Sequence, residues 1–502
     1  MHLGGPISSK AVIDIGSNSV RLVIYDVLGS ALLPHYNEKV MARLGDGLRE
    51  TGQLSVKGVE VALGALARFR AILKGLEVTQ IRTVATAAVR MAENGAAFIS
   101  RVHDEIGLRV DIISGTEEAQ LSARGVAAGF HNVSGLVGDL GGSSLEFCAL
   151  KEGHIGQGES LILGPLALDA RHRDLEKLAK PVARELAKSN LLADYGGSFL
   201  MVGGAWRALA KLHMEIVDYP LRQLHHYRMD ARAVRMVVEA AMSDDPLNRE
   251  RRVQASRRRS DILPYAGLVL GELFEIGGFS EVIVSAYGLR EGALVAENTA
   301  TSIGRDGLTD GVVLSGRLRD QTLEFGQALS AWTTPVIRPQ EDLFGEPEVH
   351  DRLIAAACLH ADFGARLHPD TRAQLAFERV LFGAYANVTH AERTFIALAV
   401  GYRYTHNFKA NEQSILGLLS KGQIKLARQL GACMRLGAVF SGRSASVLES
   451  VQLSRGGGLL TLSVSEENRA LVSSTVRRRL QTLADLLDCE WQIAIDGKPV
   501  EL

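Results

Sequence analysis

Cysteine is scarce in this chain of 502 residues, and its cysteines form no local pairs. The four cysteines, Cys148, Cys358, Cys433 and Cys489, lie far apart, and no Cys-x-x-Cys motif occurs. This spacing argues against a disulfide framework and against a zinc ribbon. No apolar run approaches the ~18 residues of a membrane span, and the segment after Met1 lacks the basic and then apolar pattern of a secretory signal. We therefore expect a cytoplasmic protein that does not enter a membrane.

Excess charge of one sign is also absent, because the formal net charge is −1. This balance argues against a protein that coats nucleic acid. One local exception is a run of six arginines within eleven residues, interrupted by the single acid Glu250: Arg249, Arg251, Arg252, Arg257, Arg258 and Arg259. Such a run is either a solvated charged loop or a contact surface for a polyanionic substrate.

The length is too great for one hydrophobic core and predicts roughly 3 to 4 domains. We place two lobes of alternating strands and helices at residues 1–132 and 133–300. A helical domain follows at 312–445, and a small α/β domain at 446–502. Within these, Ser55 is expected to cap a helix, and a single helix is expected over 466–487.

One motif occurs twice and gives the first indication of function. Asp14 and Asp139 each begin the pattern Asp-aliphatic-Gly-x-x-Ser-aliphatic, and each copy lies between two strand-like apolar runs. The pattern predicts two β-hairpins whose tight turns present backbone N–H groups and hydroxyls. Successive N–H groups in a Gly-rich bend form a concavity that binds anions. We therefore expect two related lobes that face each other across a phosphate group.

Four motifs in order resemble those of one enzyme family. They are residues 14–19 (DIGSNS), 113–119 (ISGTEEA), 139–146 (DLGGSSLE) and 285–292 (SAYGLREG). The chain resembles the exopolyphosphatase / guanosine pentaphosphate phosphohydrolase family, in its long form, a branch of the actin–hexokinase–heat-shock-ATPase superfamily. The resemblance implies an α/β fold with two actin-like (ribonuclease H-like) lobes. An all-α domain similar to HD phosphohydrolases and a small α/β tail complete the expected architecture.

The resemblance also implies a set of acidic residues with distinct roles. Glu118 corresponds to the glutamate that activates the attacking water. Its neighbour Glu117 fits a helix capping box with Ser114, so the capping pattern explains Glu117 but not Glu118. The resemblance assigns Asp139 and Glu146 to a bound Mg²⁺, with Asp14 near metal-bound water. Hard carboxylate oxygens suit Mg²⁺, which keeps several water and phosphate ligands.

The phosphate-binding residues implied by the resemblance are the two turns and one arginine. The turn residues are Gly16, Ser17, Asn18 and Ser19 in the first copy, and Gly141, Gly142, Ser143 and Ser144 in the second. Arg90 matches the arginine that clamps the terminal phosphate, and a planar guanidinium suits that role. Arg257, Arg258 and Arg259 are assigned to guiding a polyphosphate chain. The second turn has Ser143 and Leu145 where the family usually has Gly and Thr.

The helical domain is not expected to hold a second catalytic centre. His360 lies where HD phosphohydrolases carry adjacent His-Asp metal ligands, but Ala361 replaces the Asp. We expect this domain to serve dimer formation or selection of substrate length. Its candidate polyanion contacts are Lys421, Lys425, Arg428, Arg435 and Arg443.

The favoured function is Mg²⁺-dependent release of terminal orthophosphate from inorganic polyphosphate by a cytoplasmic homodimer. Whether K⁺ acts as a second cofactor stays open. The alternative is removal of the 5′ terminal phosphate from guanosine pentaphosphate at the same site. A third reading, from a different class, is a non-hydrolytic, actin-like ATP-binding switch. Neither nucleic acid nor a membrane is expected as a partner.

Overall fold

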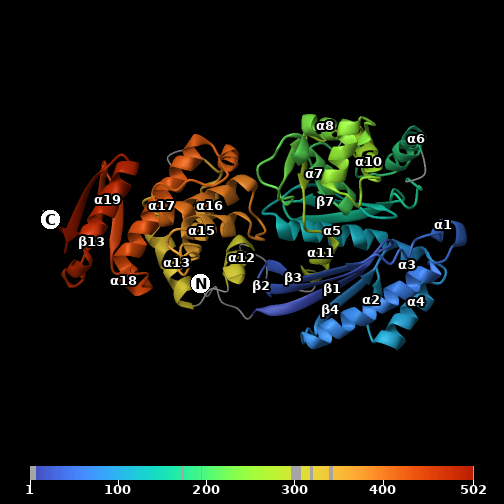
Figure 1. The fold of residues 1–502 in the computed structure, drawn as a ribbon, viewed down its shortest axis with the longest axis horizontal. Helices are drawn as coiled ribbons and strands as arrows, with labels where there is room; N and C mark the ends of the chain where they lie inside the picture. Colours follow the sequence, from blue (N-terminus) through green and yellow to red (C-terminus); the bar gives the residue numbers. More distant parts are fainter. Residues whose placement is uncertain are drawn as a thin grey trace. The chain divides into compact units, whose positions relative to one another are not determined.

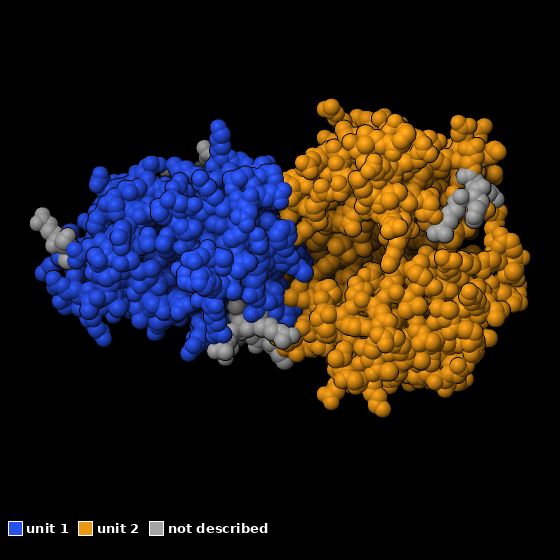
Figure 2. Space-filling view, in the orientation of Figure 1, with its two compact units in different colours: residues 1–4, 308–502 blue, residues 5–307 orange. Residues whose placement is uncertain are grey.

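The computed structural model describes residues 7–170, 174–193, 195–295, 307–316, 320–337 and 343–500. These residues fall into two compact units, one within Gly5–Gly307 and the other within Leu308–Leu502 (Figure 2). No helix in the described ranges is both long enough and apolar enough to cross a membrane.

The first lobe contains a five-stranded sheet. Its strands are β1 (Ser8–Ile15), β2 (Val20–Leu28), β3 (Ala31–Val40), β4 (Gln80–Ala85) and β5 (Asp111–Ile112). The strand order is β3-β2-β1-β4-β5. The first three strands pair antiparallel, and β4 and β5 continue the sheet in parallel. Its helices are α1 (Leu48–Thr51), α2 (Val56–Gly75), α3 (Ala87–Met91), α4 (Gly95–Arg101) and a π-helical turn η1 (Val102–Ile106).

The second lobe repeats this plan. Its strands are β6 (Gly135–Leu140), β7 (Leu145–Lys151), β8 (His154–Leu161), β9 (Ser198–Val202), β10 (Arg228–Asp230) and β11 (Glu281–Val284). In the order β10-β11-β9-β6-β7-β8, three antiparallel strands again precede two parallel ones, and β10 adds an antiparallel edge. The duplicated motif therefore reflects a duplicated sheet, as the sequence predicts.

Helices separate the two sheets and cover their outer faces (Figure 1). They are α5 (Gly115–Gly129), α6 (Leu175–Leu186), α7 (Gly204–Ile216), α8 (Ala231–Met242), α9 (Pro246–Ala255), α10 (Leu263–Gly277) and α11 (Leu289–Val295). α5 packs on β6, β7 and β8, whereas α11 packs on α5 and on β1. α2 covers the outside of the first sheet, and α7 and α8 cover the outside of the second. Each sheet thus has apolar cores on both faces. The outer cores include Phe69 and Trp206, and the inner cores include Val12 and Val137.

Glycines allow α5 to lie very close to the segment that begins α11. A Cβ atom at Gly125 would lie 1.9 Å from the carbonyl oxygen of Gly288, and one at Gly292 would lie 1.8 Å from that of Leu121. Only hydrogen fits at these positions. This contact fixes the 288–292 segment against the helix that begins just before Glu118.

The second unit is helical and ends in a small sheet. Its helices are α12 (Gly307–Gly316), α13 (Asp320–Thr333), α14 (Pro347–Leu359), α15 (Arg372–Leu381), α16 (His390–Tyr404), α17 (Lys421–Ser441) and α18 (Ala445–Glu449), with a 3₁₀ turn η2 (Gln413–Leu418). The tail contains β12 (Gln452–Gly456), β13 (Leu459–Val464), η3 (Glu466–Leu471), α19 (Ser474–Leu486), β14 (Glu490–Ile495) and β15 (Lys498–Pro499). The strands follow the order β12-β13-β14-β15, and α19 packs on α17.

Two local predictions have different outcomes. Ser55 caps α2 as expected, because its hydroxyl accepts a hydrogen bond from the N–H of Gly58 at 3.2 Å. The single helix expected over 466–487 is wrong, since it is split into η3 and α19. Ser473 has extended backbone and its hydroxyl accepts from the N–H of Val476, so it starts a new helix in the middle of the predicted one.

The close helix contact gives a stability prediction. Gly125→Ala should lower the free energy of unfolding by about 1–3 kcal/mol, because the added methyl group would overlap backbone atoms of Gly288. Gly64→Ala, at an exposed position of α2 with no atom within 4 Å of the new Cβ, should instead raise it by about 0.5–1 kcal/mol. Urea unfolding of both variants measures the difference. Equal midpoints for Gly125→Ala and the wild type would contradict the close contact.

Candidate active site

The two predicted turns are built in the same way. Gly16 donates its N–H to the carbonyl of Ser19 at 3.0 Å, and Gly141 donates to the carbonyl of Ser144 at 2.9 Å. The first turn joins β1 to β2 and the second joins β6 to β7. Each turn therefore closes with one hydrogen bond between its first and fourth residues.

The two turns meet each other at the centre of the cleft. Ser143 donates its hydroxyl hydrogen to Oγ of Ser17 at 2.9 Å, across 126 positions of sequence. Neighbouring loops occupy carbonyls of the turns: Gly45 N–H donates to Ser17 at 2.8 Å, and Leu166 N–H donates to Gly142 at 2.9 Å. With these carbonyls engaged, and with the N–H groups of Gly16 and Gly141 closing the turns, the N–H groups of residues 17–19 and 142–144 are the donors left for an anion.

A cavity of about 420 Å³ lies between the lobes, and the predicted residues gather around it. Its lining includes the eight turn residues and four carboxylates, Asp14, Glu118, Asp139 and Glu146. Of the three arginines proposed to guide a chain, Arg259 lines the cavity, whereas Arg257 and Arg258 are exposed residues outside its lining. Arg90 is also outside the lining but contacts Glu118.

Strand register places charged residues in a row across each sheet. In the first lobe Asp14 pairs with Arg21, and Arg21 pairs with Lys39. In the second lobe Asp139 pairs with Glu146, and Glu146 pairs with Ser160. The duplicated fold thus carries a row that is mostly basic on one side of the cleft and a row that is mostly acidic on the other.

The acidic row is buried and held by hydroxyl groups. Glu146 is 2% exposed and accepts a hydrogen bond from Ser160 at 3.0 Å. Asp139 accepts from Ser122 of α5 at 2.8 Å. Burial raises the pKa of Asp139, and burial together with the charge of Glu118 raises the pKa of Glu146 well above its ordinary value. Because Glu146 is buried, it is not a solvent-facing acid of the hairpin.

Glu118 lies in the first turn of α5 and faces the cavity, whereas Glu117 is exposed. Ser114 caps the helix by accepting the N–H of Glu117 at 3.1 Å, which is one of the two hydrogen bonds of the predicted capping box. Oε2 of Glu118 lies 3.3 Å from Nη1 of Arg90, which also donates to the carbonyl of Ile113 at 2.6 Å. Burial raises the pKa of Glu118 to about 7, although Arg90 opposes the shift.

Cations surround the carboxylates on both sides of the cavity. Those in its lining are Arg21, Lys39, Arg207, Lys211, Arg259 and Arg290. Nη1 of Arg290 lies 3.7 Å from Oδ2 of Asp14, and Nε of Arg207 donates to the carbonyl of Ser285 at 2.9 Å. Burial and the charges of Arg259 and Arg21 lower the pKa of Lys39 to about 8. This crowding of positive charge is the arrangement expected around a polyanion.

Comparison with known families identifies the chain. The model of the Ppx/GppA phosphatase family matches residues 12–300, more than half of the sequence. The chain belongs to the Ppx/GppA phosphatase family. A second model, that of the exopolyphosphatase C-terminal region, matches residues 316–493. The family resemblance carried by the four sequence motifs is therefore confirmed.

Solved structures support the fold of this Ppx/GppA protein. A Ppx/GppA family member from Aquifex aeolicus is 27% identical and covers 59% of this chain and 98% of its own, with a TM-score of 0.52. The structure of an exopolyphosphatase from Cytophaga hutchinsonii ATCC 33406 is 23% identical, covers 59% of this chain and 100% of its own, and has a TM-score of 0.53. The two actin-like lobes are thus a shared fold.

Sequence reasoning left five of the cavity cations without a role: Arg21, Lys39, Arg207, Lys211 and Arg290. Arg21 and Lys39 could be found from the hairpin register, because each lies opposite the preceding member of the row that begins at Asp14. Arg290 belongs to the fourth family motif. Arg207 and Lys211 lie one turn apart on α7, and no motif includes them.

The carboxylates fit a Mg²⁺ ion with few protein ligands. In the ranges that the structure describes, no group of three or more His, Cys, Asp or Glu side chains forms a closed metal cage. Mg²⁺ does not require one, since it is often bound by one or two carboxylates and the substrate's phosphates. The charge of the neighbouring Glu118 raises the pKa of Glu146, and a bound cation would offset this repulsion.

The raised pKa of Glu118 gives a pH prediction for the metal-free protein. Between about pH 4.5 and 7 the folded protein keeps a proton that the unfolded chain has lost, so this group makes stability fall as pH rises through that window. Glu118→Gln should raise the Tm at pH 8 and leave it nearly unchanged near pH 4. Calorimetry in chelator from pH 4 to 8 measures this, with exposed Glu117→Gln as the control. Parallel curves for Glu118→Gln and the wild type would contradict a buried acid that titrates near neutrality.

Proposed function

We propose that this Ppx/GppA phosphatase hydrolyses the terminal phosphoanhydride bond of inorganic polyphosphate and releases orthophosphate. The observation that carries the proposal is the single cavity between the two related lobes. There the two Gly/Ser turns meet, and the lining contains four carboxylates and six cationic side chains. Such a site needs little covalent chemistry from the protein, because positioning and charge stabilisation account for most of phosphoryl transfer.

The chain's own residues divide the work of the reaction. The N–H groups of residues 17–19 and 142–144, which do not close the turns, bind the non-bridging oxygens of the terminal phosphoryl group. Glu118 holds the attacking water and takes its proton, and a pKa near 7 suits a general base. When the phosphate displaces Arg90 from its 3.3 Å contact with Glu118, the guanidinium moves to the phosphate and the carboxylate is freed for water.

A Mg²⁺ ion held by Asp139 and Glu146 would neutralise charge on the phosphoryl oxygens. Ser122 and Ser160 orient these two carboxylates through hydrogen bonds of 2.8 and 3.0 Å. Asp14 lies on the opposite lobe, where Arg290 offsets its charge. The first-lobe row of Arg21 and Lys39 then binds the next phosphates of the chain, since these two cations follow Asp14 across the sheet.

The residues around the cavity favour polyphosphate over guanosine pentaphosphate. Among the described residues that line it there is no Phe, Tyr, Trp or His on which a guanine base could stack. The Gly203-Gly204 turn joins β9 to α7 and forms part of the cavity wall. The guanidinium of Arg259 covers this turn, because a Cβ on Gly204 would lie 2.6 Å from its Nη2 atom. Cations without stacking rings suit a chain of phosphates more than a nucleoside.

The test is Mg²⁺-dependent orthophosphate release from long-chain polyphosphate and from guanosine pentaphosphate by the full-length protein. Glu118→Gln should lower kcat on polyphosphate by roughly 10²–10⁴-fold, the contribution typical of a general base. Glu117→Gln, one residue away on the exposed side of α5, should leave kcat within about twofold of the wild type.

The outcomes separate the alternatives. Release from guanosine pentaphosphate alone, lost in Glu118→Gln, would replace the substrate while keeping the site. Equal loss in both glutamine variants would remove Glu118 as the base. Hydrolysis of ATP that is insensitive to Glu118→Gln, with no release from either phosphate substrate, would favour the actin-like switch.

A further inference from the structure

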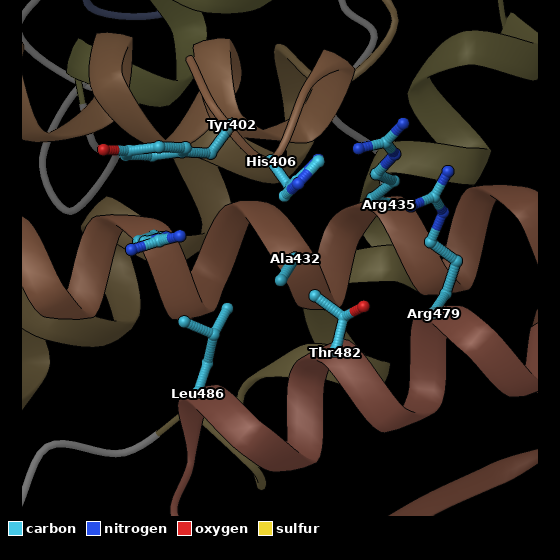
Figure 3. Close-up of a pocket in the computed structure, with 8 residues that line it drawn as sticks. Tyr402, His406, Ala432, Arg435, Arg479, Thr482 and Leu486 are labelled. Atoms are coloured by element: carbon cyan, nitrogen blue, oxygen red, sulfur yellow. The ribbon is translucent and has the colours of Figure 1, made fainter. Parts of the chain in front are cut away.

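A second, smaller cavity lies in the helical unit, where α16, α17 and α19 meet (Figure 3). Its volume is about 30 Å³. We call it the arginine pocket; it is lined by Tyr402, His406, Arg428, Ala432, Arg435, Arg479, Thr482 and Leu486. Arg435 of α17 and Arg479 of α19 lie together at one end, and Tyr402 lies at the other (Figure 3).

Positive charge at the arginine pocket is not balanced by carboxylates. Burial and the charges of Arg479, Arg403 and Arg372 lower the pKa of Arg435 to about 10. Of these neighbours, Arg403 lies 3.7 Å from Asp362, and Arg372 lies over the ring of Tyr404 at 5.5 Å. Within the described ranges, neither Arg435 nor Arg479 has an ion pair with a carboxylate.

The guanidinium groups also keep unused donors. In the part of the chain that the structure describes, Nη1 of Arg435 and Nε of Arg479 are buried without a hydrogen-bond partner. A buried donor left unpaired is costly. In the first unit, by contrast, Arg252 donates to the carbonyls of Ala240, Ala241 and Ser243. The two pocket arginines therefore differ from an arginine that only supports the fold.

Size and shape restrict what the arginine pocket could hold. A single water needs about 10–15 Å³ of such volume, so about 30 Å³ has room for a compact group the size of two or three waters. That room suits a tetrahedral oxyanion but not a nucleoside. Planar guanidinium forks match the oxygens of phosphate. The apolar floor formed by Ala432 and Leu486 offers no competing acid.

We propose that the arginine pocket binds a single phosphate oxyanion between the guanidinium groups of Arg435 and Arg479. Free orthophosphate and the end group of a longer phosphate chain share this chemistry. The site lies in the second unit and does not depend on the hydrolysis proposed for the first.

The experiment is hydrogen exchange by mass spectrometry on the full-length protein, with titrations of inorganic phosphate. Peptides from α17 and α19 should exchange more slowly as phosphate is added. Arg435→Gln and Arg479→Gln should each raise the phosphate concentration needed for half of this protection at least tenfold. Arg478→Gln is the matched control, because it removes the same charge from an exposed neighbour on α19 that is not in the lining of the pocket and donates to the Thr475 hydroxyl at 3.5 Å. Its half-saturation should stay within twofold of the wild type.

A second arm distinguishes the sources of the anion. Tripolyphosphate is titrated into the Glu118→Gln variant in the presence of chelator, so that the tripolyphosphate is not hydrolysed during the experiment. If tripolyphosphate half-saturates the site at the same concentration as orthophosphate, the ligand is the free ion. If it does so at a concentration at least tenfold lower, the ligand is the end of a phosphate chain. Either result supports the oxyanion site.

Two results would overturn the proposal. One is unchanged exchange of the α17 and α19 peptides with every phosphate compound, or protection that persists in Arg435→Gln and Arg479→Gln. The other is a lower Tm for Arg435→Gln in phosphate-free buffer, which would show that the arginine holds α17 to α19. The oxyanion site predicts an equal or higher Tm there, because the variant removes an unpaired and repelled cation.

Discussion

The structure depends on the placement of four carboxylates in one buried cleft, where each disfavours the ionisation of the next. Burial raises the pKa of Asp14, Glu118, Asp139 and Glu146 together. A fold that assembles such a cluster needs counter-charges, and this chain provides them as Arg90, Arg290 and hydroxyl donors rather than as tight ion pairs. A cation and a polyanion that bind together would therefore stabilise the ionised cleft.

This arrangement requires a fixed placement of the two lobes relative to each other, and close backbone contacts provide that placement. α5 carries Glu118 and Ser122, and the same helix contacts the Gly288–Gly292 segment with no room for a side chain. Glu291 of that segment accepts hydrogen bonds from Tyr25 Oη at 2.6 Å and from Gly288 N–H at 2.9 Å. Arg290 is thereby fixed between the lobes, where it reaches Asp14. A close helix contact and one buried carboxylate thus set the geometry of residues that come from four distant parts of the sequence.

Local signals in the sequence were sufficient for the hairpins and for most of the helices. The turns at Gly16 and Gly141 follow from glycine and serine spacing, and the cap of α2 follows from Ser55. What failed was the helix over 466–487, because an internal serine such as Ser473 either caps a helix or lies within one, and only the surrounding packing decides. The cations Arg207 and Lys211 were missed for a related reason. Both lie on the amphipathic helix α7, whose sequence carries no motif. Their side chains line a cavity only because residues of the first lobe form its other wall.

The arginines show most clearly why a run of one residue type in the sequence does not reveal what each member does in the structure. Within the run at 249–259, Arg252 is buried and donates to the carbonyls of Ala240 and Ala241 near the end of α8, so it stabilises that helix terminus. Arg259 of the same run lies over Gly204 in the cavity, whereas Arg257 and Arg258 are exposed. The distinguishing property is whether the protein itself satisfies the guanidinium. Arg252 has its acceptors within the fold, and Arg435 has a buried donor with none among the described residues. This difference is why we propose a phosphate as the partner of Arg435 and a structural role for Arg252.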